Sequence, residues 1–252
     1  MPRILVTNDD GVRSSGIKAL ARCLRPLGDV YVVAPESEAS AIGHALTLRR
    51  PLRIEECGDQ VFGVDGTPTD CVNIAVSQIL HGVPDLVVSG INKGFNLGDD
   101  ITYSGTVAGA LEGVLLGAPS MAVSQQRVQG EFDFTQATRA TVKLAREILN
   151  HGLATRTFLN VNVPTQRAQG IKVTVQARRN HRTSVAKAFD PRHQPYYWID
   201  EAQLEWEADD RSDYQSIREG WISVTPLQPD WTSHSTLGSV SALVASVTLE
   251  TT

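Results

Sequence analysis

Hydrophobic residues in the first two thirds of the chain follow two alternating patterns, short apolar runs and longer stretches with helical spacing. The runs at 4–7, 30–33, 85–89, 121–124 and 158–163 are typical of buried strands. The stretches at 15–27, about 70–80, 105–116 and 134–150 predict helices, with Thr69 or Asp70 as the cap of the second and Asp133 of the fourth. Two less regular segments, at 46–48 and 61–64, predict further strands. These repeated strand–helix units predict an α/β fold, a three-layer arrangement with a mostly parallel sheet between helices.

The pattern changes after about Gln176. Residues 177–220 show little periodicity, many charges and an aromatic group at Tyr196, Tyr197 and Trp198. A structureless loop of this length is uncommon in a compact domain, so we expect a hairpin extension that packs on another subunit or covers the site. Residues 222–226 then predict a returning strand, and 237–249 a closing helix. We therefore expect an α/β core over 1–176 and an extension over 177–252 that is not an independent domain.

Composition narrows the classes of partner. The chain has 252 residues, of which 20% are charged, and a net charge of −5, which argues against a nucleic-acid polymer as partner. No apolar run approaches the roughly 20 residues that a membrane-spanning helix needs, and the start has no signal-peptide layout. The three cysteines are widely spaced without a CxxC pair. We therefore expect a cytoplasmic protein with structural thiols and no membrane contact.

Two adjacent carboxylates, Asp9 and Asp10, stand where the first predicted strand meets Gly11. Carboxylates side by side repel each other and are costly to bury, so a positive charge must stabilise them if they are enclosed. A hard divalent cation fits this requirement. The alternative interpretation is an exposed Asp-Asp-Gly turn, which is common in loops.

Other polar residues gather at the same edge of the predicted sheet, because ligands of parallel α/β sheets bind beyond the carboxyl ends of the strands. Ser40 lies in the loop after the second strand, and Asn92 follows the strand at 85–89. With the two carboxylates they form a set of hard oxygen ligands that suits Mg²⁺, Mn²⁺ or Ca²⁺ better than zinc.

The helix at 105–116 begins with Ser104, Gly105 and Thr106. Hydroxyls, free backbone N–H groups and the positive end of a helix dipole make such a turn suitable for phosphate. Ser104 could instead be only the N-cap of the helix, and the two roles are compatible. Lys93 could add charge to the phosphate or be a solvated surface lysine.

Several ordered motifs together resemble the SurE family, the survival-protein nucleotidases. They are Asn8-Asp9-Asp10-Gly11, Gly66-Thr67-Pro68-Thr69-Asp70-Cys71-Val72, Ser89-Gly90-Ile91-Asn92, Asn96-Leu97-Gly98-Asp99-Asp100 and Tyr103-Ser104-Gly105-Thr106-Val107. The resemblance runs from Arg3 to about Val163. It implies a Rossmann-like core with a swapped C-terminal extension, a homodimer or homotetramer, and a phosphatase of nucleoside 5′- and 3′-monophosphates that uses one divalent cation, Mg²⁺ or Mn²⁺, per subunit. By position it implies the metal ligands Asp9, Asp10, Ser40 and Asn92, and a phosphate site of Asn96, Ser104, Gly105 and Thr106.

The loop before Ser40 departs from the family pattern, which usually has basic residues there. Glu38 and Ala39 stand in their place, which predicts weaker attraction for polyanions such as polyphosphate. His44 could compensate when protonated or be structural.

For catalysis, with Asp9, Asp10, Asn96, Ser104 and Thr106 as candidate residues, either water or Asp9 could attack phosphorus. We favour water, because the carboxylates are adjacent rather than in the Asp-x-Asp spacing of aspartyl-phosphate phosphatases. The competing interpretations are an aspartate-nucleophile phosphatase of another α/β family and a nucleotide sensor without turnover. A dehydrogenase is a weaker interpretation still, because the turn after the first strand lacks the G-x-G-x-x-G that binds a pyrophosphate.

Overall fold

The computed structural model describes residues 1–126, 132–180, 183–201 and 205–247. A nine-stranded sheet in this part of the chain has the order β3-β4-β2-β1-β5-β6-β7-β13-β8. Its strands are β1 (Arg3–Thr7), β2 (Asp29–Pro35), β3 (Ile54–Gly58), β4 (Val61–Val64), β5 (Leu86–Asn92), β6 (Ser120–Gln125), β7 (Phe158–Val163), β8 (Ile171–Val173) and β13 (Ile222–Leu227). Strands β4, β2, β1, β5, β6 and β7 run parallel, whereas β3 and β13 are antiparallel to their neighbours β4 and β7.

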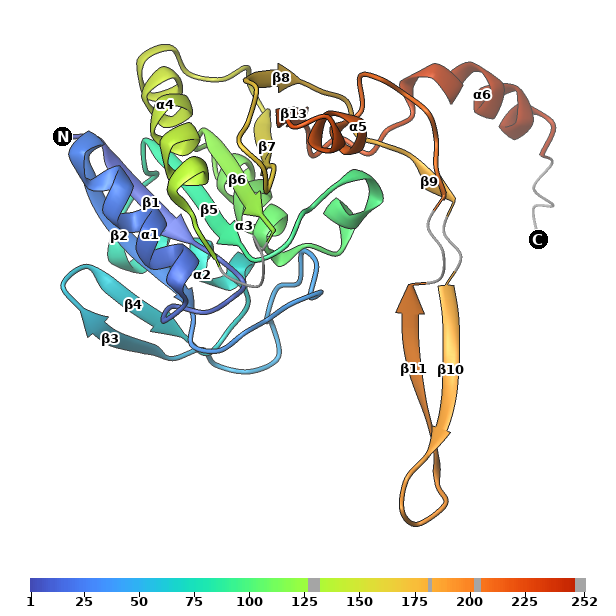
Figure 1. The fold of residues 1–252 in the computed structure, drawn as a ribbon, viewed down its shortest axis with the longest axis horizontal. Coiled ribbons are helices and arrows are strands. Elements are labelled where there is room, and N and C mark those ends of the chain that lie inside the picture. Colours follow the sequence, from blue (N-terminus) through green and yellow to red (C-terminus); the bar gives the residue numbers. More distant parts are fainter. Residues whose placement is uncertain (127–131, 181–182, 202–204, 248–252) are drawn as a thin grey trace, which may run out of the picture.

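Helices cover both faces of this sheet (Figure 1). They are α1 (Ser15–Leu24), α2 (Pro68–Ile74), α3 (Gly105–Leu115) and α4 (Thr135–His151). Alternate side chains of β1 pack on opposite faces of the sheet. Ile4 and Val6 pack in the core beneath α1 and α4, and Leu5 packs in the core on the α2 side. This double burial explains the continuous apolar run of the first strand and confirms the expected three-layer α/β fold.

The structure corrects several predicted boundaries. Residues 46–48 form no strand; the strand lies instead at β3, where it pairs with β4. Helix α2 is capped by Thr67, not by Thr69 or Asp70, because Pro68 occupies the first helical position, where it lacks an N–H to satisfy. The side chain of Asp133 accepts a hydrogen bond from the Thr135 N–H at 2.9 Å, although the cap residue of α4 is Phe134.

The remaining boundaries differ at the helix ends. Helix α1 stops at Leu24 and continues as the 3₁₀ turn η1 (Arg25–Leu27), with Pro26 at its start. The helix at the C-terminus, α6, covers Leu237–Ala245, and residues 248 and 249 of the predicted closing helix lie outside the described part.

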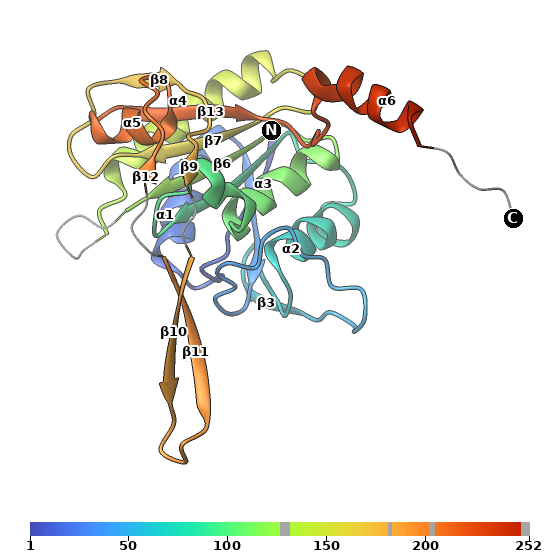
Figure 2. The same ribbon diagram turned by 90° about the vertical axis from the view of Figure 1, so that its right-hand side faces the viewer.

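The predicted hairpin is present as β10 (Thr183–Phe189) and β11 (Pro195–Glu201), which pair antiparallel and project from the core (Figures 1 and 2). Short strands β9 (Arg179–Asn180) and β12 (Glu205–Trp206) lead into it, and α5 (Asp213–Arg218) follows. Helix α6 also extends away from the sheet, and none of its residues is buried. Within the described residues, no helix is both long and apolar enough to cross a bilayer.

Candidate active site

Asp9 lies at the carboxyl end of β1 and is almost completely buried, with 5% of its surface exposed. The Thr106 hydroxyl, in the first turn of α3, donates a hydrogen bond to its Oδ1. Burial raises the pKa of Asp9 above its ordinary value, although the Thr106 hydrogen bond opposes that shift. A buried, oriented carboxylate of raised pKa is a stronger base than a surface aspartate.

Gly105 allows α3 to come this close. A β-carbon at this position would stand 2.8 Å from the Asp9 Cβ and 3.0 Å from its Oδ2. Both distances are shorter than ordinary van der Waals contacts. Only glycine therefore lets the N-terminus of α3 rest against the carboxylate.

The two carboxylate oxygens of Asp10 differ in their surroundings. Its Oδ1 is 3.7 Å from Lys93 Nζ, whereas its Oδ2 is buried and accepts no hydrogen bond from the part of the chain that the structure describes. Burial raises the pKa of Asp10; Lys93 opposes this rise, and Asp9 adds to it. The exposed-turn interpretation of the Asp-Asp pair is thus wrong for this protein.

One open cavity of about 660 Å³ unites most of the predicted site. Its lining includes Asp9, Asp10, Ser40, Asn92, Asn96 and Ser104, and also Lys93. Gly105 and Thr106 do not line it, but they contact Asp9 from behind. Residues separated by almost a hundred positions therefore meet, because β1 and β5 end, and α3 begins, at the same edge of the sheet.

Asn96 is held by three side chains that the sequence analysis did not identify. Its Nδ2 donates to Ser124 Oγ at 2.8 Å, and its carbonyl accepts from the amides of Asn160 and Asn162. Asn162 Oδ1 also accepts from the Asn96 N–H at 2.9 Å. The only sequence signal was an alternating pair of asparagines within a buried strand, which is an unfavourable place for amides without a partner.

Ser104 is the N-cap of α3, and its Oγ accepts a hydrogen bond from the Val107 N–H at 3.1 Å. The cap interpretation is thus confirmed. The N-terminus of this helix lies at the cavity, where its dipole favours an anion.

Several residues that line the cavity lie outside the predicted set, among them Glu38 and Ile199. Glu38 lines it, and Ser40 Oγ donates to Glu38 Oε1 at 2.8 Å. Ile199, on strand β11 of the hairpin, also contributes to the lining. The hairpin thus contributes one residue to the lining, and whether the extension covers the site stays a prediction.

The donor set fits a hard divalent cation. The unpartnered Oδ2 of Asp10 offers a ligand atom, and Asp9, the Ser40 hydroxyl and the Asn92 side chain supply further oxygens at the same cavity. The described residues contain no group of three or more His, Cys, Asp or Glu side chains placed for a metal. The candidate set is therefore a carboxylate pair completed by neutral oxygen donors.

Comparisons by family model, by sequence and by structure all find proteins of one family. The family model described as Survival protein SurE matches residues 4–183. A 5′-nucleotidase SurE from Syntrophotalea carbinolica is 52% identical over 91% of this chain and 92% of its own length. A 5′-nucleotidase SurE 1 from Thermus thermophilus is 46% identical over 97% of this chain and 99% of its own. The crystal structure of the Aquifex aeolicus SurE protein superimposes with a TM-score of 0.86 at 43% identity, covering 96% of this chain and all of that one.

Proposed function

The chain belongs to the SurE family, and from this premise we propose that it is a divalent-metal-dependent phosphatase that hydrolyses nucleoside 5′- and 3′-monophosphates to nucleoside and phosphate. The observation that carries the proposal is the meeting of Asp9 and Asp10 with the N-terminus of α3 at one cavity. Carboxylates there can hold a cation, and the helix terminus beside them can receive a phosphate.

The cation, Mg²⁺ or Mn²⁺ with one per subunit, would be held by Asp9, Asp10, Ser40 and Asn92. When bound it would neutralise phosphate charge and lower the pKa of a bound water. The buried Oδ2 of Asp10 and the raised pKa of both carboxyl groups support this assignment, since a cation stabilises their charged forms.

The phosphate would bind at the turn formed by Ser104, Gly105 and Thr106, of which Ser104 lines the cavity, with Asn96 at its side. The N-terminus of α3 supplies positive potential, and the fixed position of Asn96 costs no reorganisation when charge develops on phosphorus-bound oxygens. Asp9 would accept the proton of the attacking water, because Thr106 fixes its orientation and burial strengthens it as a base. Trapping of a phosphorylated Asp9 would show that the carboxylate attacks instead.

We expect a homodimer or homotetramer, formed through the part of the proposed extension over 177–252 that lies outside the sheet. Large apolar side chains of the extension are exposed, among them Trp198 and Ile199 on β11 and Leu243 on α6. Exposed apolar surface of this extent is typical of protein interfaces. Light scattering should give a multiple of the chain mass, and Leu243→Glu should reduce it.

The three free cysteines favour a cytoplasmic location.

The experiment that tests the function is phosphate release from a panel of nucleoside monophosphates after EDTA treatment, with Mg²⁺ or Mn²⁺ restored separately. Release that returns with metal is the expected result, and the panel ranks base and ester position. Background release under every metal, from protein whose circular dichroism shows it folded, would favour a nucleotide sensor.

A further inference from the structure

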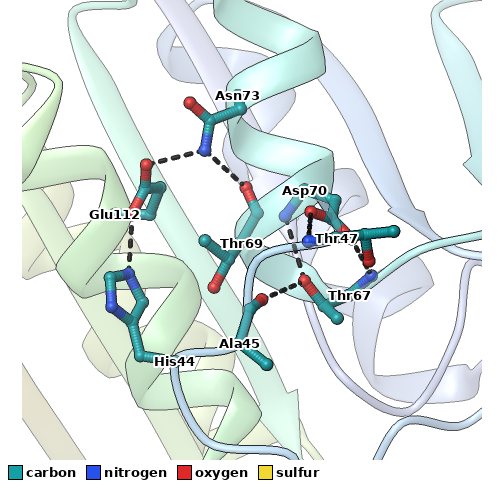
Figure 3. A network of polar contacts seen from close by, with 8 residues as sticks. All are labelled: His44, Ala45, Thr47, Thr67, Thr69, Asp70, Asn73 and Glu112. Atoms are coloured by element: carbon teal, nitrogen blue, oxygen red, sulfur yellow. Dashed lines mark hydrogen bonds and ion pairs between the residues drawn. The ribbon is translucent and has the colours of Figure 1, made fainter. Parts of the chain in front are cut away.

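The loop between β2 and β3 carries a candidate metal ligand near its start and is fastened to two helices further on. Ser40 lies at the cavity with Asp9 and Asp10. Residues 43–47 lie against α2 and α3, where side chains from both helices reach the loop (Figure 3). The loop that carries Ser40 is thus held by contacts outside the cavity.

The first attachment is to α3. His44 Nε2 is 2.7 Å from Glu112 Oε2, and Glu112 Oε1 accepts from Asn73 Nδ2 of α2 at 2.6 Å (Figure 3). Glu112 is 8% exposed, so water competes little for these hydrogen bonds. Beside them the Gly43 N–H donates to the Tyr103 carbonyl at 2.9 Å. The helix whose N-terminus forms the phosphate site therefore also holds the loop.

The second attachment uses the cap of α2. Thr67 and Asp70 form a capping box, and each also binds the loop: Thr67 Oγ1 donates to the Ala45 carbonyl at 2.7 Å, and Asp70 Oδ1 accepts from the Thr47 N–H at 2.8 Å. Asp70 is 1% exposed. The side chains of Thr67 and Asp70 therefore do more than cap the helix. They also hold a loop segment that lies more than twenty positions earlier in the chain.

Between these attachments and the site the loop is strained. Ala41 has φ of 55°, in the left-handed region that is unfavourable for an alanine. On its other side the Ala39 N–H donates to the Asp9 carbonyl at 2.8 Å. Such a conformation persists where the surrounding contacts impose it, and here it lies directly after Ser40 at the cavity.

We propose that His44 and Glu112 are positioning residues of the metal site: with the Thr67–Asp70 box they form a clamp that holds the loop so that Ser40 faces Asp9 and Asp10. The proposal rests on the proposed function, because the task of the clamp is to complete the metal site. It also gives His44 a role that does not require it to attract polyanions.

The test compares His44→Ala with His151→Ala in the full-length protein. His151 pairs with Glu147 at 3.5 Å on the exposed end of α4, and neither residue lines the cavity, so this is a control histidine–glutamate pair outside the site. Three quantities are measured for each variant. They are the Mn²⁺ affinity by calorimetry, kcat and KM with a nucleoside monophosphate, and the Tm in the presence of EDTA. We expect His44→Ala to weaken Mn²⁺ binding by about tenfold, as changes behind metal ligands commonly do, and His151→Ala to leave it unchanged. Glu112→Gln, which keeps a hydrogen-bonding side chain, should be closer to wild type than Glu112→Ala.

The outcomes separate positioning from stability. Weaker Mn²⁺ binding by His44→Ala, with a Tm in EDTA close to that of wild type, supports the clamp. A His44→Ala/Glu112→Ala double variant that binds Mn²⁺ no more weakly than Glu112→Ala alone also supports it. A lowered Tm with unchanged Mn²⁺ affinity, or a variant that matches wild type in both, overturns it. Wild-type protein that binds Mn²⁺ but releases no phosphate contradicts the proposed function alone, since calorimetry still compares the variants. Wild-type protein that binds no Mn²⁺ overturns both.

Discussion

Replacing Gly105 by alanine tests whether the approach of α3 to Asp9 sets the activity. The new Cβ would stand 2.8 Å from the Asp9 Cβ, whereas carbon atoms pack at about 3.5–4.0 Å. Helix and carboxylate would therefore have to separate by about 0.7–1.2 Å. A misplacement of about 1 Å at a reacting group can cost about 100-fold in rate, so kcat/KM should fall by about that factor.

The same substitution should have a smaller effect on stability. Overpacking typically costs about 1–3 kcal/mol, but alanine favours a helix over glycine by up to about 1 kcal/mol. A net loss of no more than about 2 kcal/mol lowers Tm by at most about 8 °C in a chain of this length. The protein should thus stay folded at assay temperature while it loses most of its activity.

The assay is metal-restored phosphate release, with Gly238→Ala as the control. Gly238 is also helical, and a β-carbon there meets nothing within 4 Å, so its activity should match wild type, with the oligomeric state checked by light scattering. Folded Gly105→Ala protein with wild-type kcat/KM and wild-type Mn²⁺ affinity would refute the argument that contact between α3 and Asp9 positions the catalytic groups.

Four further results are expected. Asp9→Asn should lose most phosphate release while keeping the circular dichroism spectrum of the fold; near-wild-type turnover would show that the site lies elsewhere. Thr106→Val should lower kcat/KM by about 10–100-fold, since a charged hydrogen bond is worth about 1.5–3 kcal/mol, and Thr106→Ser should restore it. Glu38→Gln should raise hydrolysis of short polyphosphate relative to nucleoside monophosphate, because Glu38 adds negative charge at the cavity; an unchanged ratio would argue against that role. In EDTA, the Asp9→Asn variant should have a higher Tm than wild type at neutral pH, and this difference in Tm should disappear as the pH falls to about 4. The sign follows because burial lifts the folded-state pKa of Asp9 above its ordinary 3.8, so ionisation destabilises the folded protein as pH rises through that interval.

The sequence predicted those features that depend on local pattern. The buried strands and the helices were found because doubly covered strands are apolar throughout and helices repeat with their own period. The carboxylate pair, Ser40 and Asn92 were placed at one edge because parallel strands share their carboxyl ends.

What the sequence did not predict depends on contacts between distant segments. Asn160 and Asn162 read as polar positions of an alternating strand, and nothing local indicates that they hold Asn96. The partner of His44 lies 68 positions away on α3. The strand expected at 46–48 failed for a related reason: the Thr47 N–H is bound by Asp70 rather than by a neighbouring strand.

The small residues of α3 connect the fold to the chemistry. Gly109 and Gly113 follow Gly105 at intervals of one helical turn, and each faces the sheet. A β-carbon on Gly109 would stand 2.8 Å from Thr7 Cγ2, and one on Gly113 would stand 2.9 Å from Val87 Cβ. The helix therefore lies closer to β1 and β5 than side chains would permit, and its first turn comes down onto Asp9. A larger residue at any of these positions would lift the helix from the sheet, so the same glycines that weaken α3 as an isolated helix place its N-terminus at the carboxylate.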